Sequence, residues 1–135
     1  MQSNYGFFCD AATTDASGKL NVLGIFNSVN VVSFPGSLHR MFLVLSVETH
    51  RSEQGTHSAR INLVDQDGSE VTPAIVHSFE IVAGQSEVKL IVEFNNLTFP
   101  KPGTYAADMT VDNHHIKSLA LQVFGSRGGP PGPPK

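Results

Sequence analysis

Cys9 is the only cysteine of the chain, and Asp10 follows it directly. A thiol beside a carboxylate is a candidate nucleophile or metal ligand. A reactive thiolate needs a nearby cation or a helix N-terminus, whereas the negative charge of Asp10 disfavours it. In an alternating strand, Cys9 shares a face with Tyr5, Phe7 and Ala11, and free cysteine is among the most buried residue types. We therefore expect Cys9 to be an inert core thiol, and Asp10 stays without a role.

The histidines are a second set of candidate ligands. A zinc site needs three or four nitrogen or sulfur ligands that converge on one point. His114 and His115 are adjacent, so in a strand they point to opposite faces. His50 and His57 flank one loop and can meet only as a pair. We therefore predict surface or turn histidines and no zinc site. The six are His39, His50, His57, His77, His114 and His115.

Acidic residues gather in the stretch DQDGSE, which contains Asp65, Asp67 and Glu70. Two interpretations stay open. The stretch is an Asp-rich turn closed by Gly68, or it is part of a calcium-binding loop in which Asp65 and Asp67 are the metal candidates and Asp112 is a further carboxylate. The full ligand set of an EF-hand is missing, and no flanking helices are predicted.

Motifs of known enzymes are absent from the sequence. There is no Gly-x-Ser-x-Gly, phosphate-loop, dinucleotide-binding or His-Glu-x-x-His pattern. Serine, histidine and aspartate are all present, but their spacing indicates no catalytic triad, which is recognised by geometry. We therefore expect no catalytic residues, no cofactor and no enzyme activity. An enzyme of an unrecognised type is the remaining alternative.

The charge balance is unfavourable for nucleic-acid binding, because nine Lys and Arg against twelve Asp and Glu give a net charge of -3. No apolar run approaches the roughly 20 residues of a membrane-spanning helix. The opening stretch MQSNYGFFCDAA has no features of a secretory signal. A single cysteine forms no internal disulfide, which is typical of a reducing compartment. We expect a cytoplasmic protein with no nucleic-acid or membrane partner.

Alternating apolar and polar residues predict β-strands along most of the chain. In SEVKLIVEF, Val88, Leu90, Val92 and Phe94 share one face, as the side chains of a half-buried strand do. MFLVLSVE, residues 41–48, is apolar on both faces and predicts a central strand covered on both sides. Turn sequences separate these runs, and VAGQSE is predicted to be a hairpin turn. The turn sequences are TTDASGK, FPGS, DQDG, VAGQSE, KPGT and DNHH.

These runs predict an all-β fold, an antiparallel two-sheet β-sandwich of eight or nine strands, immunoglobulin-like or jelly-roll-like. Tyr105 follows a Pro-Gly turn, a position near an inter-sheet corner where the ring fills the core and the hydroxyl bonds to the backbone. We assign residues 1–124 to the β-sandwich domain. Residues 125–135, GSRGGPPGPPK, have no large apolar side chain, so we expect a flexible Gly/Pro-rich tail.

Several short motifs are shared with one known family. They are Phe7, Cys9, Asp10 and Ala12, then residues 18–24, Phe26 and Phe34-Pro35, and later residues 63–68 and 102–112. With these motifs the chain resembles a bacterial domain family of unknown function over residues 5–123. The resemblance implies a small β-sandwich and no established activity. The family's turn glycine is Asn113 here, and asparagine accommodates the same backbone.

These observations predict a non-catalytic interaction or structural module, which binds protein partners or self-associates into an assembly. A sheet edge favours such contacts, because its unpaired backbone groups accept a further strand. The alternative is a loop-based module that binds calcium or another ligand.

Overall fold

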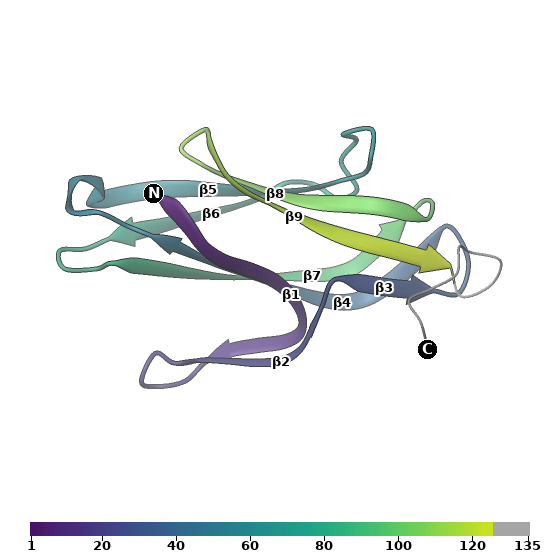
Figure 1. Cartoon of the computed structure of the whole chain (residues 1–135), viewed down its shortest axis with the longest axis horizontal. Helices are drawn as coiled ribbons and strands as arrows, with labels where there is room; N and C mark the ends of the chain where they lie inside the picture. Colours follow the sequence, from purple (N-terminus) through teal and green to yellow (C-terminus); the bar gives the residue numbers. More distant parts are fainter. Residues whose placement is uncertain (126–135) are drawn as a thin grey trace.

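A computed structural model of the chain describes residues 1–125 as nine strands and one short 3-10 turn (Figure 1). The strands are β1 (Gln2–Thr14), β2 (Leu20–Phe26), β3 (Ser28–Val31), β4 (Gly36–Glu48), β5 (Gly55–Val64), β6 (Ile75–Ile81), β7 (Glu87–Phe99), β8 (Gly103–Val111) and β9 (His114–Gly125), with η1 (Arg51–Glu53) between β4 and β5. The tail predicted for residues 125–135 lies outside the described residues, except for Gly125 at the end of β9.

The strands form two sheets. One has four strands in the order β2-β1-β4-β7, and the other has five in the order β3-β9-β8-β5-β6. The all-β prediction is confirmed. The five-stranded sheet is curled into a half-barrel, so the two sheets do not by themselves establish the predicted sandwich. Within residues 1–125, no helix has the length and apolar character needed to cross a membrane.

One strand pair departs from the predicted antiparallel arrangement. β3 pairs in parallel with β9, with Ser28 opposite Gln122 and Val31 opposite Gly125. After β2, the chain leaves the four-stranded sheet and enters the five-stranded sheet beside its last strand (Figure 1). Parallel partners cannot be joined by a tight turn, and here five strands separate β3 from β9 along the chain. Turn signals report only on neighbouring runs, which is why the sequence did not reveal this pair.

β4 is the predicted central strand. It lies between β1 and β7 and pairs with both. Met41, Leu43 and Leu45 contribute to the main core, while Val44 belongs to a second apolar cluster. The continuous apolar run is explained by this placement, because both faces of the strand are covered.

The main core is formed by side chains from both sheets. Each large apolar side chain that is fully buried contributes roughly 1.5–3 kcal/mol relative to its exposed state. The core residues include Phe8, Met41, Leu43, Leu45, Leu90, Val92 and Phe94 from the four-stranded sheet and Ile61, Leu63, Tyr105, Met109, Leu121 and Val123 from the five-stranded sheet.

The buried residues of β1 are divided between the two apolar clusters, which the alternation of the sequence did not predict. Cys9 is buried in the second cluster beside Val44, with Tyr5 and Phe7 packed against it. Phe8, rather than Phe7, contributes to the main core. The sequence FFCDAA is apolar on both faces near its start, so alternation alone did not identify which face would meet the other sheet.

The predicted position of Tyr105 near an inter-sheet corner is confirmed. The turn before it connects β7 and β8, which belong to different sheets. Its hydroxyl donates a hydrogen bond of 2.6 Å to the carbonyl oxygen of Lys101. Its buried ring makes an edge-to-face contact with Phe99, with 5.0 Å between the ring centroids. The side chain therefore ties the corner to the core, as a buried tyrosine with a satisfied hydroxyl does.

The stretch VAGQSE is not the predicted hairpin turn. It connects β6 to β7, and these strands lie in different sheets. Gly84 has φ of 82°, so the local turn chemistry was identified correctly. The hairpin prediction was wrong because a turn sequence sets the local change of direction and does not select the strand with which the next run pairs.

Candidate functional site

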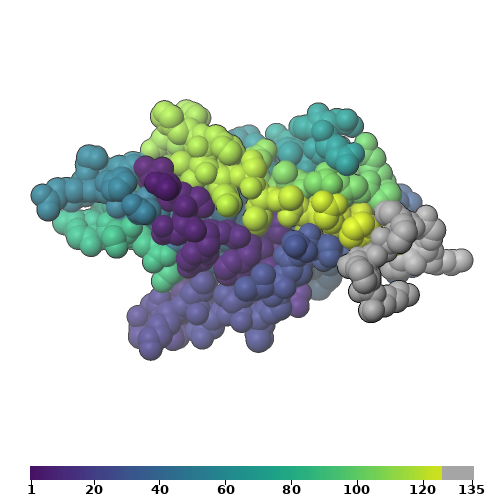
Figure 2. All heavy atoms as spheres, in the orientation of Figure 1, coloured from purple at the N-terminus to yellow at the C-terminus, as the bar shows by residue number. Residues whose placement is uncertain are grey.

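The end of β1 and the whole of β2 form a hairpin that projects from the other strands (Figure 1). In the space-filling view it is a lobe along the lower edge of the molecule (Figure 2). The hairpin contains most of the motif residues that the N-terminal half shares with the resembled family. The hairpin is therefore a candidate functional surface.

Asp15 organises the tip of this hairpin. Its Oδ1 accepts hydrogen bonds from the backbone N–H groups of Ser17 and Lys19, both at 2.9 Å, and from the Ser17 hydroxyl at 2.6 Å. The bond from the Ser17 side chain is the main cause of the lowered pKa of the Asp15 carboxyl. Gly18 completes the turn with φ of 84°, a conformation that glycine adopts without strain.

Asp10 now has a structural role. The register of β1 and β2 places it opposite Gly24, between the pairs Cys9 with Ile25 and Ala11 with Leu23. A Cβ atom built on Gly24 would lie 2.2 Å from Asp10 Oδ2. The carboxylate therefore packs directly on the Cα of Gly24, which explains why an acidic residue and a glycine occur together in this hairpin.

Two large apolar side chains of β2 are exposed. Leu23 is 71% exposed and Ile25 is 64% exposed. They are two residues apart in one strand, so they project from the same face. Among residues 1–125, β2 is the outermost strand of its sheet and pairs only with β1. This edge therefore presents apolar side chains and unpaired backbone groups together.

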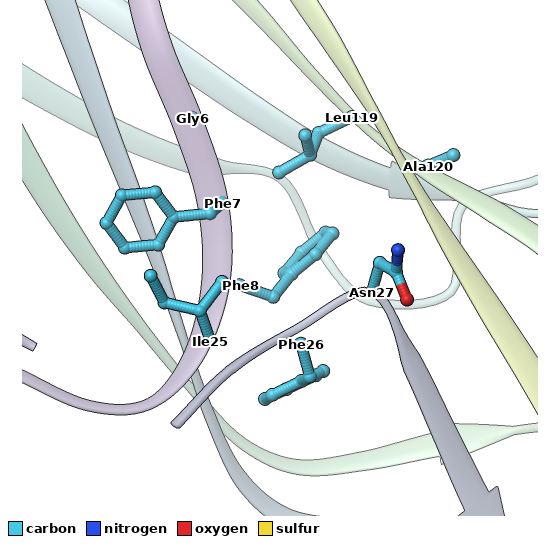
Figure 3. A pocket seen from close by; sticks show the side chains of 8 residues that line it. All are labelled: Gly6, Phe7, Phe8, Ile25, Phe26, Asn27, Leu119 and Ala120. Carbon is cyan, nitrogen blue, oxygen red and sulfur yellow. The ribbon is translucent and has the colours of Figure 1, made fainter. Parts of the chain in front are cut away.

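An apolar groove lies at the base of the hairpin, where β2 meets the five-stranded sheet. Its volume is about 280 Å³. The Phe8 and Phe26 rings are stacked with 6.3 Å between their centroids. Figure 3 shows Phe7 and Ile25 on one side of the β1 ribbon and the Phe8 ring on the other. The groove is lined by Gly6, Phe7, Phe8, Ile25, Phe26, Asn27, Leu119 and Ala120. The exposed Ile25 thus belongs both to the edge and to the groove.

Cys9 is fully buried and forms no disulfide, as predicted for an inert core thiol. Burial is the main cause of its raised pKa, and the charge of Asp10 acts in the same direction. A thiol held in the protonated form is a poor nucleophile.

His57 of β5 connects the 3-10 turn η1 to the turn between β8 and β9. Its Nδ1 lies 2.5 Å from Asp112 Oδ2, and its Nε2 lies 2.6 Å from the carbonyl oxygen of Glu53. Both partners only accept hydrogen bonds, so both ring nitrogens must carry protons, which makes the ring an imidazolium. The hydrogen bond with Asp112 is the main cause of the raised pKa of His57. The ring has no free lone pair, so it is neither a general base nor a metal ligand in this state.

Asp112 was considered from the sequence only as a possible calcium ligand, and its contact with His57 was missed. Besides His57, it accepts a hydrogen bond of 3.0 Å from the backbone N–H of Ser58, and the bond with His57 is the main cause of its lowered pKa. The two partners are 55 positions apart, so no local pattern connects them. His50 and His57 do not meet across their loop. They have separate partners, since His50 Nε2 lies 3.9 Å from a Glu48 oxygen and His57 contacts Asp112 and Glu53.

The metal candidates Asp65 and Asp67 lie in the turn between β5 and β6. Asp65 Oδ1 accepts hydrogen bonds from the backbone N–H groups of Asp67 and Ser69, at 2.9 and 3.0 Å, the same arrangement that Asp15 has in the first hairpin. Asp67 Oδ2 lies 3.3 Å from Lys101 Nζ. In residues 1–125, no group of three or more His, Cys, Asp or Glu side chains is placed to hold a metal ion.

Asp112 is not near these two carboxylates. Val64 at the end of β5 pairs with Ala106, whereas Ala59 near the middle of the strand pairs with Val111. Asp112 lies beside Ser58, seven residues before Asp65, which corresponds to roughly 20 Å at the rise of a β-strand. Asp112 is therefore too far away to serve as the third carboxylate of a calcium site with Asp65 and Asp67.

One Ser-His-Asp contact occurs on the five-stranded sheet. His115 Nε2 lies 2.9 Å from Ser118 Oγ, and this hydroxyl donates a hydrogen bond of 2.5 Å to Asp108 Oδ1. A catalytic triad requires the imidazole between the serine and the carboxylate. Here the serine is in the middle, so the imidazole does not pass its proton to the carboxylate and the hydroxyl is not activated.

None of the curated proteins matches the chain significantly in sequence. Among solved structures, the chain is similar to the alkylpurine DNA glycosylase AlkC of Pseudomonas fluorescens, solved bound to DNA containing an abasic site analog. The match has a TM-score of 0.47 and 16% sequence identity, and it covers 72% of this chain. The chain corresponds to only 27% of the length of that protein.

This similarity contradicts two expectations from the sequence, that the chain is not an enzyme and that nucleic acid is excluded as a partner. Both are withdrawn. They rested on the absence of known motifs and on total charge, whereas catalysis and nucleic-acid contacts depend on local geometry and local charge. The similarity is too low to assign the activity of the glycosylase to this chain.

The family comparison covers nearly all of the described residues. One family model matches residues 4–124, a range that contains the projecting hairpin, the groove and the His57–Asp112 contact. The resemblance in the N-terminal motifs therefore extends through both sheets. The chain belongs to the family described as "Family of unknown function (DUF6941)".

Proposed function

We propose that the protein is a protein-interaction module that binds its partner through the β1–β2 hairpin. The observation that carries this proposal is the exposure of Leu23 and Ile25, at 71% and 64%, on an edge strand. Single exposed apolar residues are common on protein surfaces, but adjoining ones beside an apolar groove are typical of interaction sites. Here Ile25 also lines the groove.

The architecture supports such a role. We infer that the two sheets form an open β-sandwich, of the immunoglobulin-like or jelly-roll-like kind, because one core draws side chains from both. The hairpin projects from this body. A rigid body that presents a strand edge is well suited to strand addition, in which backbone groups supply affinity and side-chain pockets supply specificity.

The setting that we propose is the cytoplasm. The single cysteine is free and buried, which is the usual condition of a thiol in a reducing compartment. A binding surface on the hairpin does not depend on this setting.

A photo-crosslinking amino acid placed at position 23 in the native host tests the interaction proposal. The matched control carries the same amino acid at Val76, an exposed apolar residue of β6 in the other sheet. We expect crosslinks to one defined protein, identified by mass spectrometry, from position 23 and not from position 76. No defined adduct at position 23, or the same adducts from both positions, would refute the proposal.

A further inference from the structure

We infer that the partner of the hairpin is a second copy of this chain, and that the β2 strands of two copies pair antiparallel to join their four-stranded sheets into one. This inference rests on the proposed function, because it names the partner that binds to the hairpin. It is carried by the chemistry of the sheet edges, by the direction of the free backbone groups of β2 and by the position of its exposed side chains.

Charge distinguishes β2 from the other sheet edges of residues 1–125. Edge strands are normally protected from pairing by charged side chains, by short length or by proline. β7 carries Glu87, Lys89 and Glu93, and β6 carries His77 and Glu80, while β3 has only four residues. β2, with the sequence LNVLGIF, is seven residues long and has no charged side chain and no proline.

A second copy meets no like charges at this edge. The chain has a net charge of -3, so contact between two copies is opposed wherever acidic residues face one another. Two β2 strands bring only neutral side chains into register. A two-fold contact is also self-complementary, because each strand offers the same groups that it requires from the other.

The direction of the free backbone groups follows from the hairpin tip. The backbone N–H of Asp15 donates to the carbonyl of Lys19 at 2.9 Å. Hydrogen-bonded and non-hydrogen-bonded pairs alternate along an antiparallel ladder. Counting from the pair Asp15 with Lys19, residues 21, 23 and 25 direct their backbone groups toward β1. Residues 20, 22 and 26 direct theirs toward the open side, where they are available to another strand.

Gly24 does not interrupt this edge. Its φ of 66° is explained within the chain by the carboxylate of Asp10, which lies where a Cβ atom would be. β2 keeps the same register with β1 on both sides of Gly24, since Leu23 pairs with Ala11 and Ile25 with Cys9. The strand therefore runs through this residue without a bulge.

One register overlaps the two β2 strands along their whole length. It pairs Leu20 of one copy with Phe26 of the other, and Val22 with Gly24. Leu20, Val22 and Phe26 then direct their free backbone groups toward the second copy. The Leu23 residues of the two copies then face each other across the two-fold axis. They form a non-hydrogen-bonded pair, in which the two Cα atoms are about 4.5 Å apart, closer than in a hydrogen-bonded pair. The side chain that is 71% exposed in one copy is thereby covered in the dimer.

The register makes a sharp test possible, because Cys9 is buried and a new cysteine would be the only accessible thiol. Cysteines whose Cα atoms are about 4.5 Å apart can form a disulfide. We expect purified full-length Leu23→Cys to form a disulfide-linked dimer under mild oxidation, whereas Val76→Cys, exposed to 59%, stays largely unlinked. Equal linking of both variants, or no linking of Leu23→Cys, would overturn the inference.

A second measurement avoids dependence on disulfide chemistry. Sedimentation equilibrium of the full chain should show a concentration-dependent dimer, and Leu23→Lys should weaken it by about tenfold or more, since two like charges would face each other at the axis. Val76→Lys should leave it unchanged, and circular dichroism checks the fold of each variant. A strict monomer, or a dimer insensitive to Leu23→Lys, would overturn the inference. If position 23 crosslinks instead to a different protein in the host, the proposed function holds and only the choice of partner fails.

Discussion

At the scale of single residues, polar contacts connect positions that are distant in sequence at one end of the molecule. His57 is held by Asp112 and by the carbonyl oxygen of Glu53. Glu53 is itself bound, because its carboxylate accepts hydrogen bonds from the amino group of Met1 at 2.5 Å and from the backbone N–H of His50 at 2.8 Å. The protonation of a few side chains at this end of the molecule therefore contributes to its stability.

The first prediction concerns pH and His57. Its raised pKa means that its contribution is fully present below the unfolded-state pKa of about 6.5 and is lost as the pH rises through the higher folded-state value. Asp112 has a lowered pKa, so its share is lost as the pH falls through its folded-state value. We expect His57→Gln to lower the melting temperature more at pH 5.5 than at pH 9, as measured by thermal unfolding.

The control for this prediction is His39→Gln, at an exposed position of β4 whose side chain has no hydrogen bond or ion pair with another of residues 1–125. Its effect on the melting temperature should be small and similar at the two pH values. A His57→Gln effect that is the same at pH 5.5 and pH 9 would show that the imidazolium is not the stabilising form.

At the scale of the elements, two local interactions shape the hairpin. One is the turn around Asp15 at its tip, and the other is the packing of Asp10 on Gly24 along its length. The packing of Asp10 on Gly24 holds β1 and β2 in register. A register slip by one residue would turn every side chain to the other face, and Leu23 and Ile25 would then no longer be displayed.

The second prediction concerns Gly24. Alanine there would combine an unfavourable positive φ with a contact of 2.2 Å to Asp10, so we expect Gly24→Ala to cost about 1–3 kcal/mol of unfolding free energy. Gly18→Ala is the matched control, because Gly18 has φ of 84° with no atom within 4 Å of the added Cβ. It should cost less, about 1 kcal/mol.

A double-mutant cycle separates the two causes of the Gly24→Ala effect. Asp10→Ala removes the carboxylate, so Gly24→Ala should cost less in that background, as measured by urea unfolding. Equal costs of Gly24→Ala with and without the carboxylate would show that Asp10 does not determine the choice of glycine.

At the scale of the whole molecule, the two apolar clusters share strands. Phe8 and Cys9 are neighbours in β1 but belong to different clusters, and Leu43 and Val44 of β4 do the same. Because these strands carry both clusters, the hairpin base and the space between the sheets should lose their packing together. We therefore regard the body and the hairpin base as one cooperative unit.

The third prediction uses Cys9 as a probe of this unit. Its thiol is fully buried, so labelling by a thiol reagent requires opening of the second cluster. We expect the free energy of opening, from labelling rates in increasing urea, to match the global free energy of unfolding from circular dichroism. Rapid labelling without denaturant, or an opening free energy far below the global value, would show that the hairpin opens by itself.

Much of the fold was predictable because it depends on local chemistry. Alternation with a period of two identifies strands, and turn residues such as Gly68 or Asn113, with φ of 82° and 69°, identify the breaks between them. The burial of Cys9 and the corner role of Tyr105 followed from residue type and from a few neighbours in sequence. These properties are determined by the sequence itself, since the groups concerned lie within a few residues of each other.

Only the tertiary structure decided which runs pair and which groups meet. The parallel pair of β3 with β9, the core role of Phe8, the contact of His57 with Asp112 and the contact of Asp10 with Gly24 each join segments that the sequence does not mark as partners. Which of these segments meet depends on the summed packing of both sheets. For the same reason, only the sheet order showed that LNVLGIF is an exposed edge strand.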